Sequence, residues 1–144
     1  MKNVTKLLLL LSIIAIGFSS CSKEKRIEKH LYSKSGKWNN TLYDYKYYYN
    51  GVQESSIVYQ NAGYIEFEKD GKFTWVFTAD GSTDASSGTW SNTEDKLTLV
   101  EPGNTVIYTI LEESKKTLKL EYSESSTEFG DEKETYTLTF EKEK

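Results

Sequence analysis

Large apolar residues alternate with polar ones along most of the chain, and the alternation is clearest over residues 63–90. Its apolar positions are Ile65, Phe67, Phe73, Trp75, Phe77 and Trp90. A period of two with aromatic and β-branched enrichment is typical of strands that bury one face. The stretch therefore predicts a hairpin followed by a third strand, with these apolar side chains pointing inward.

The turn within this hairpin decides which residues face each other. A two-residue loop would place Glu66 on the same face as Trp75, and burying an unpaired carboxylate against an aromatic ring is unfavourable. A three-residue loop, Lys69–Gly71, with a bulge at the glycine shifts the pairing by one residue. Ile65 then lies opposite Trp75 on the buried face. The apolar pattern therefore predicts the bulged turn.

A tyrosine-rich strand precedes the hairpin. Its tyrosines at alternate positions are Tyr43, Tyr45, Tyr47 and Tyr49. Asn50-Gly51 then predicts a tight turn into a second strand over residues 52–59. Because tyrosine combines apolar area with a hydroxyl group, this face suits a surface that contacts sugars or protein. A wall packed inside the mouth of a barrel is the alternative, and the sequence leaves both open.

Alternation continues downstream to residue 140. The inward positions there are Leu97, Leu99, Val106, Tyr108, Ile110, Leu118, Leu120, Tyr122, Tyr136, Leu138 and Phe140. A four-residue loop, Asn92–Asp95, is expected to pair Trp90 with Leu97. The chain then has eight or nine antiparallel strands joined by short turns. The predicted fold class is all-β, an up-and-down antiparallel β-barrel, because closure removes the exposed edges of an open sheet.

The first 20 residues have a different pattern. Two lysines precede an apolar run from Leu7 to Phe18, and small residues follow before Cys21. This order is typical of a signal peptide, and the run is shorter than the ~20 residues that a membrane-spanning helix needs. Phe18-Ser19-Ser20-Cys21 resembles the lipobox of bacterial lipoproteins. That resemblance implies cleavage after Ser20 and lipidation of Cys21.

We therefore predict a lipoprotein signal peptide over residues 1–20, a flexible lipid-anchored tether over 21–35 and the barrel over 36–144. Acyl chains on Cys21 would anchor the protein to the outer membrane of a cell envelope, on its periplasmic or its surface face. A secretory signal with an incidental cysteine is the alternative. His30 is expected to be a solvated residue of the tether.

Charge and composition argue against several functions. The chain has 144 residues with 22 acidic and 18 basic side chains, and two lysines lie in the signal peptide, so the mature net charge is about −6. An acidic domain is a poor partner for nucleic acid. With one histidine in the tether and one cysteine at the cleavage point, we predict no catalytic triad, no zinc site and no cofactor. The protein is not expected to be an enzyme.

Several short motifs occur in a familiar order. They are Gly36-x-Trp38, the hairpin from Phe67 to Phe73, Gly88-Thr89-Trp90, Lys96–Leu99, Tyr108–Leu111 and Lys116–Leu120. Over residues 36–141 the chain resembles the small bacterial lipocalin-like lipoproteins. The resemblance implies a short barrel on a lipid tether and, in most members, no assigned ligand.

Six aromatic residues are expected to converge inside the barrel. These candidate cavity-lining residues are Trp38, Phe73, Trp75, Phe77, Trp90 and Tyr108. The interior of an eight-stranded barrel is wide enough for side chains or for one small ligand. The barrel is therefore either a binder of a small apolar or amphiphilic ligand or a filled module with a structural or protein-binding role, such as an inhibitor or assembly partner. An apolar cavity of ~300 Å³ or more would favour the ligand.

Overall fold

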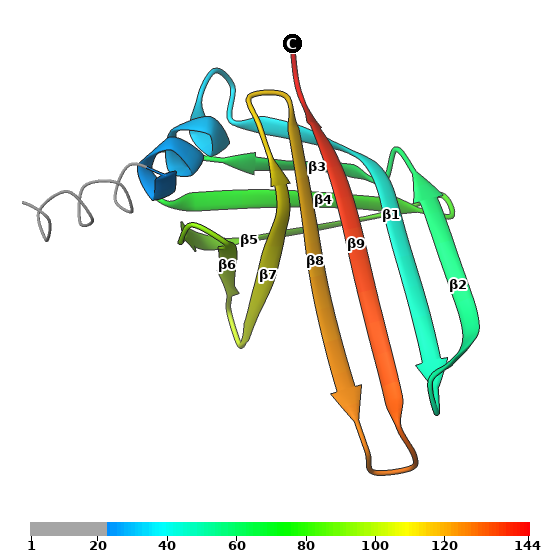
Figure 1. The fold of residues 1–144 in the computed structure, drawn as a ribbon. Helices are drawn as coiled ribbons and strands as arrows, with labels where there is room; N and C mark the ends of the chain where they lie inside the picture. Colours follow the sequence, from blue (N-terminus) through cyan, green and yellow to red (C-terminus); the bar gives the residue numbers. More distant parts are fainter. Residues whose placement is uncertain (1–22) are drawn as a thin grey trace, which may run out of the picture.

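Antiparallel strands form a closed barrel in the computed structural model, which describes residues 23–144 (Figure 1). The strands are β1 (Lys37–Tyr49), β2 (Val52–Gln60), β3 (Gly63–Phe67), β4 (Lys72–Ala79), β5 (Ser82–Asn92), β6 (Lys96–Glu101), β7 (Asn104–Glu113), β8 (Thr117–Ser126) and β9 (Glu132–Lys142). Strand β1 pairs with β3 on one edge and with β9 on the other, which closes an eight-stranded up-and-down barrel. Strand β2 is an additional strand beside β1. The predicted fold class is confirmed.

The turn between β3 and β4 has the predicted bulged form. The pairs are Ile65 with Trp75, Glu66 with Thr74 and Phe67 with Phe73. Gly71 has a φ of 85°, a conformation in which a β-branched side chain would be strained. The resulting register buries Ile65 and Phe67, which are 0% and 1% exposed. The tight turn at Asn50-Gly51 is confirmed as well, because Tyr49 pairs with Val52.

The predicted pairing of β5 with β6 is wrong by two residues. Trp90 pairs with Leu99 and not with Leu97. The turn is built around Thr93, whose backbone N donates to the carbonyl oxygen of Lys96 at 2.9 Å and whose hydroxyl oxygen accepts from the backbone N of Lys96 at 3.1 Å. This local turn chemistry decides the loop position. Because the shift is an even number of residues, Trp90 still points inward.

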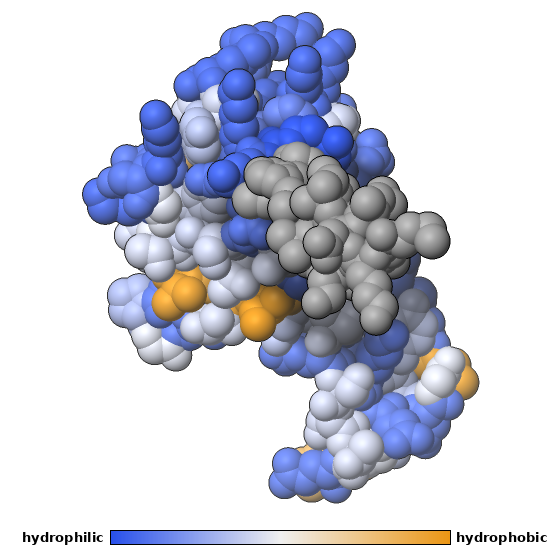
Figure 2. Space-filling model, turned by 60° about the vertical axis from the view of Figure 1, so that its left-hand side comes forward, coloured by the Kyte–Doolittle hydropathy of each residue, from blue (hydrophilic) through white to orange (hydrophobic). Residues whose placement is uncertain are grey.

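Four strands extend beyond the others at one end of the barrel. The distal parts of β1, β2, β8 and β9, residues 45–57 and 122–136, pair side by side and form what we call the arm (Figure 1). Figure 2 shows the arm standing out from the body of the molecule. The two ends of the barrel therefore differ in shape, since one carries this open sheet and the other does not.

Residues 23–32 form a helix at the other end, where a flexible tether was predicted. Ile27 and Leu31, one helical turn apart, are each 1% exposed and belong to the hydrophobic core. The Lys142 ammonium donates to the carbonyl oxygens of His30 at 2.6 Å and Leu31 at 3.0 Å. A cation at a helix C-terminus is favoured by the helix dipole. The spacing of Ile27 and Leu31 was the available sequence signal, but their packing partners lie on the barrel.

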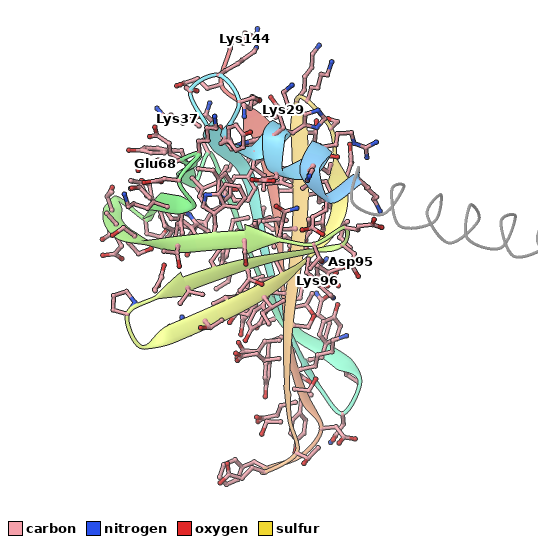
Figure 3. The ribbon with its side chains drawn as sticks, turned by 90° about the vertical axis from the view of Figure 1, so that its left-hand side faces the viewer. Lys29, Lys37, Glu68, Asp95, Lys96 and Lys144 are labelled. Carbon is pink, nitrogen blue, oxygen red and sulfur yellow. The ribbon has the colours of Figure 1, made fainter. Side chains whose placement is uncertain are left out.

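The expectation of a solvated His30 is wrong for the same reason. Its imidazole Nδ1 contacts the carboxylate of Glu113 on β7, whose side chain is 7% exposed. Arg26 lies 3.7 Å from the same carboxylate. Figure 3 shows the helix lying across this end of the barrel, with Lys29 on the helix and Lys37 at the start of β1 nearby. The helix is part of the folded domain and closes this end.

Two sequence predictions concern residues that the structure does not describe. The signal peptide over residues 1–20 and the lipidation site Cys21 lie outside the described residues, so both stay predictions. Within residues 23–144, no helix combines the length and the apolar character that crossing a membrane requires. In the same part of the chain, no three His, Cys, Asp or Glu side chains group in a way that suits a metal ion.

Candidate ligand-binding cavity

A cavity of about 360 Å³ lies inside the barrel at the end that carries the arm. Its lining residues come from β1, β4, β5, β7, β8 and β9, and they are Tyr43, Trp75, Phe77, Asp84, Ala85, Ser86, Val106, Tyr108, Tyr122, Tyr136 and Leu138. Most of these side chains are aromatic or aliphatic. Among the described lining residues, Asp84 is the only charged one.

Half of the predicted lining residues lie in this wall. The three that do are Trp75, Phe77 and Tyr108. The other three, Trp38, Phe73 and Trp90, point inward as predicted but are packed in the core and are 0%, 1% and 8% exposed. The alternating pattern identifies the inward face of a strand, but it does not say how far along the barrel axis each inward residue lies. The closed end therefore contains half of the predicted set.

The tryptophans of the closed end are held by backbone carbonyl groups. The indole N–H of Trp38 donates to the carbonyl oxygen of Leu31 at 2.9 Å, and the Lys142 ammonium lies 4.3 Å from the centre of its ring. The indole N–H of Trp90 donates to the carbonyl oxygen of Glu68 at 3.1 Å. Buried indoles need such partners. Trp38 and Trp90 consequently fix the helix and the β3–β4 turn, and neither touches the cavity.

Tyrosines that the sequence prediction did not include complete the cavity wall. The ring of Tyr43 lies 5.0 Å from Phe77 and 6.3 Å from Tyr136, and Tyr122 lies 5.8 Å from Tyr136. Tyr108 joins them at 6.0 Å from Tyr122. These distances are typical of interacting aromatic pairs. The sequence left open whether the tyrosines of this strand form an outer contact surface or a wall inside the barrel mouth. Tyr43 lies in such a wall, because its side chain lines the cavity.

The rest of the tyrosine face continues from the cavity onto the arm. One row across the four strands consists of Ile57, Tyr45, Tyr136 and Tyr122, and the next consists of Ser55, Tyr47, Glu134 and Glu124. Directly paired residues point to the same side of a sheet, so both rows share the face of Tyr43. We call this surface, on the inner side of the arm, the tyrosine–glutamate face.

The tyrosine hydroxyls of this face donate to its carboxylates. Tyr136 donates to Glu134, and Tyr122 donates to Glu124. The hydroxyl of Tyr47 donates to Glu132 at 3.1 Å. Each carboxylate therefore lies beside at least one aromatic ring. The arrangement combines apolar ring surface with negative charge at the cavity entrance.

The electrostatic environment of the tyrosines is consistent with this charge. Burial, followed by the hydrogen bond to Glu134 and its negative charge, raises the pKa of Tyr136 above the ordinary value. The hydrogen bond to Glu124, followed by burial, raises the pKa of Tyr122 to about 12. Burial is the main cause of the raised pKa of Tyr108. The shifts therefore combine the effect of burial with that of the neighbouring carboxylates.

Trp75 has a buried donor without a partner. Its indole Nε1 is shielded from solvent and has no hydrogen-bond partner among the described residues. Buried polar atoms without partners are uncommon in folded proteins, and leaving one unpaired costs about 1–3 kcal/mol. The unpaired indole N–H of Trp75 is thus enclosed by the protein, although the Trp75 side chain lines the cavity.

Comparisons with known proteins give no family for this chain and one weak structural likeness. No family model and no curated protein sequence matches the chain. Among solved structures, a deswapped triple mutant of bovine odorant binding protein matches with a TM-score of 0.39 and 14% identity, over 74% of this chain and 71% of that chain. A likeness of this size carries no argument about function. The strand order shows the architecture only, a closed eight-stranded up-and-down barrel, which lipocalins share with other groups of proteins.

Proposed function

We propose that the protein binds a small apolar or amphiphilic molecule in the cavity at the arm end of the barrel. The observation that carries the proposal is the cavity itself, about 360 Å³ with a largely aromatic wall. Its volume falls within the ~300–1,000 Å³ of ligand sites in proteins, which are mostly apolar with a few polar groups. The side chains of Asp84 and Ser86 are polar groups of this kind in the wall.

The division of the barrel supports ligand binding over a filled structural module. Packed side chains such as Trp38 and Phe73 occupy the end beneath the helix. The cavity begins where this core ends, and its wall includes Phe77, which is four residues from Phe73 on β4. In a barrel that served only as a solid module we would expect side chains to fill this volume, because close packing adds stabilising contacts.

Trp75 offers a direct test, because it is the tryptophan that lines the cavity. Residues 22–144 contain the helix, every described strand and the whole core, and circular dichroism can verify their fold before use. Titration of 1-dodecanol should change the tryptophan emission of this chain. The change should persist in Trp90→Phe, whose indole lies in the closed end, and should disappear in Trp75→Phe.

Binding of a neutral alcohol should also be almost independent of salt, since burial of apolar surface drives it. If Trp90→Phe abolished the change in emission and Trp75→Phe retained it, the alcohol would bind outside this cavity. The complete absence of binding by calorimetry, with dodecanol and with charged analogues of the same chain length, would reject the proposed function.

We also propose that the protein is a lipoprotein anchored through Cys21 to the outer membrane. The support is the order of a charged segment, an apolar run and Ser19-Ser20-Cys21 in the sequence. Metabolic labelling with a palmitate analogue should mark the wild-type chain but not Cys21→Ala. Equal labelling of both chains, or a mature N-terminus at another residue, would contradict the proposal.

A further inference from the structure

The entrance of the cavity is negatively charged on one side. On the tyrosine–glutamate face, Glu134 of β9 lies directly opposite Tyr47 of β1, and its neighbours on the same face include Tyr45, Tyr122 and Tyr136. The hydroxyl of Tyr136 donates to Glu134. The Tyr45 and Tyr136 rings lie 5.0 Å apart, and Tyr136 is also part of the cavity wall. Glu134 is therefore surrounded by aromatic rings at the boundary between cavity and arm.

Positive side chains are absent from this surface. Within residues 23–144, no lysine or arginine lines the cavity, and none occupies the two rows of the tyrosine–glutamate face. The bases nearest in sequence, Lys46 and Lys133, occupy the positions between the inward ones and so point to the opposite side of the sheet. Lys46 is paired there with Asp44 at 3.0 Å. Among the described residues, the carboxylates of the inner face have tyrosine hydroxyls as partners and no lysine or arginine paired with them.

Aromatic rings and carboxylates next to an apolar cavity have a specific chemical preference. The face of an aromatic ring attracts a cation through its quadrupole, and this attraction is strongest where water is partly excluded. A nearby carboxylate adds a direct charge interaction. An anionic head group would instead meet like charge from Glu134 and Glu124, with no base to pair with.

We propose that the ligand is a cationic amphiphile, with an apolar body in the cavity and an amine or quaternary ammonium head group against Tyr45, Tyr136 and Glu134. This inference rests on the proposed function, since it names the chemical class that the same cavity accepts. The cavity holds the apolar part by burial, and the tyrosine–glutamate face selects the charge of the head group. The raised pKa values of Tyr122 and Tyr136 agree with such a negative environment.

The test compares three molecules with the same twelve-carbon chain: dodecyltrimethylammonium, 1-dodecanol and dodecanoate. The two ionic molecules are used below their micelle concentrations and the alcohol below its solubility limit. Calorimetric titration of residues 22–144 should give affinities in that order, with about tenfold between the ammonium and the alcohol from cation–π and charge attraction. The preference for the ammonium should shrink as salt rises, because exposed charges are screened.

Two variants that each remove one negative charge test where the preference for the ammonium arises. Glu134→Gln should reduce the preference for the ammonium by about threefold or more while dodecanol binding is kept, because the amide still accepts from Tyr136 but has no charge. Glu121→Gln removes the same charge from the opposite face of β8, since Glu121 lies between the inward Leu120 and Tyr122, and should leave the preference unchanged. This control separates a local contact from the net charge of the domain.

The outcomes separate this inference from the proposed function. Equal affinities for the three molecules, or the tightest binding of dodecanoate, would overturn the cationic class and leave ligand binding in place. Equal loss of preference in Glu121→Gln and Glu134→Gln would overturn the assignment to the tyrosine–glutamate face. Binding of none of the three molecules would reject the proposed function itself.

Discussion

The two ends of the barrel are built from the same kinds of inward residue and yet differ in packing. Phe73 and Phe77 lie on the same face of β4, four residues apart. Phe73 is 1% exposed in a packed core, whereas Phe77 is partly exposed and lines a cavity. The difference lies in what covers them. At the closed end, Ile27 and Leu31 of the helix complete the core, and at the arm end no described element does so.

The polar chemistry of the two ends differs as well. At the closed end, the indoles of Trp38 and Trp90 donate to backbone carbonyl oxygens, which ties side chains to the fold. At the arm end, tyrosine hydroxyls donate to the carboxylates of partly exposed glutamates. If the proposed function is correct, one end of the barrel provides stability and the other carries the recognition surface. Each of the following measurements tests this difference between the two ends.

The largest expected effect is the difference between Phe73→Ala and Phe77→Ala. Removing the fully buried ring should lower the free energy of unfolding by about 3–5 kcal/mol, because a cavity replaces close packing. Removing the ring at the cavity wall should lower it by only about 1–2 kcal/mol, since part of its surface is already unpacked. Urea denaturation followed by circular dichroism measures both values. Equal losses would show that the two ends are packed alike.

The helix provides the second comparison. Leu31→Ala should destabilise the domain by about 2–4 kcal/mol, because Leu31 is 1% exposed in the core. Leu111→Ala, which truncates a leucine that is 48% exposed on β7, should change stability by no more than about 0.5 kcal/mol. Thermal and urea unfolding of the two variants tests whether residues 23–32 belong to the fold. If the two variants were equally stable, residues 23–32 would be a flexible tether, as the sequence predicted, and not part of the fold.

The smallest effects are expected in the dependence of stability on pH, where the two ends have opposite signs. Burial lowers the pKa of Lys142 at the closed end from 10.5 to about 8. The unfolded chain then binds more protons between these values, so stability should rise as the pH increases from about 8 towards 10.5. Lys142→Met should remove this rise in urea denaturation midpoints measured across the range.

At the arm end, the tyrosine pKa values are raised above 10.0, to about 12 for Tyr122. These tyrosines contribute fully to folding stability below the pKa that they have in the unfolded chain. This contribution is lost as the pH rises through their pKa values in the folded protein. Stability should therefore fall above pH 10 or so, and Tyr122→Phe together with Tyr136→Phe should reduce the fall. A fall of unchanged steepness in the double variant would place the responsible groups outside this end.

Local patterns along the chain were enough to predict the strands, their inward faces and the turns that carry clear signals. The alternation around Ile65 and Phe67 selected the bulged turn at Gly71, and the observed pairing agrees. These features could be predicted because a strand's period and a turn's residues are properties of neighbours in the chain. Where the turn signal was weaker, as at Thr93, the pairing of β5 with β6 was wrong while its inward face was right.

These local patterns could not predict which inward residues are covered and which border a cavity. Leu31 becomes a core residue because Trp38 and Lys142, from the two barrel strands β1 and β9, bind its carbonyl oxygen. Tyr136 becomes part of the cavity wall because the pairing of β9 with β1 and β8 brings it against Tyr45 and Tyr122. Burial is a property of everything that packs around a side chain, and here those neighbours come from segments far apart in the sequence.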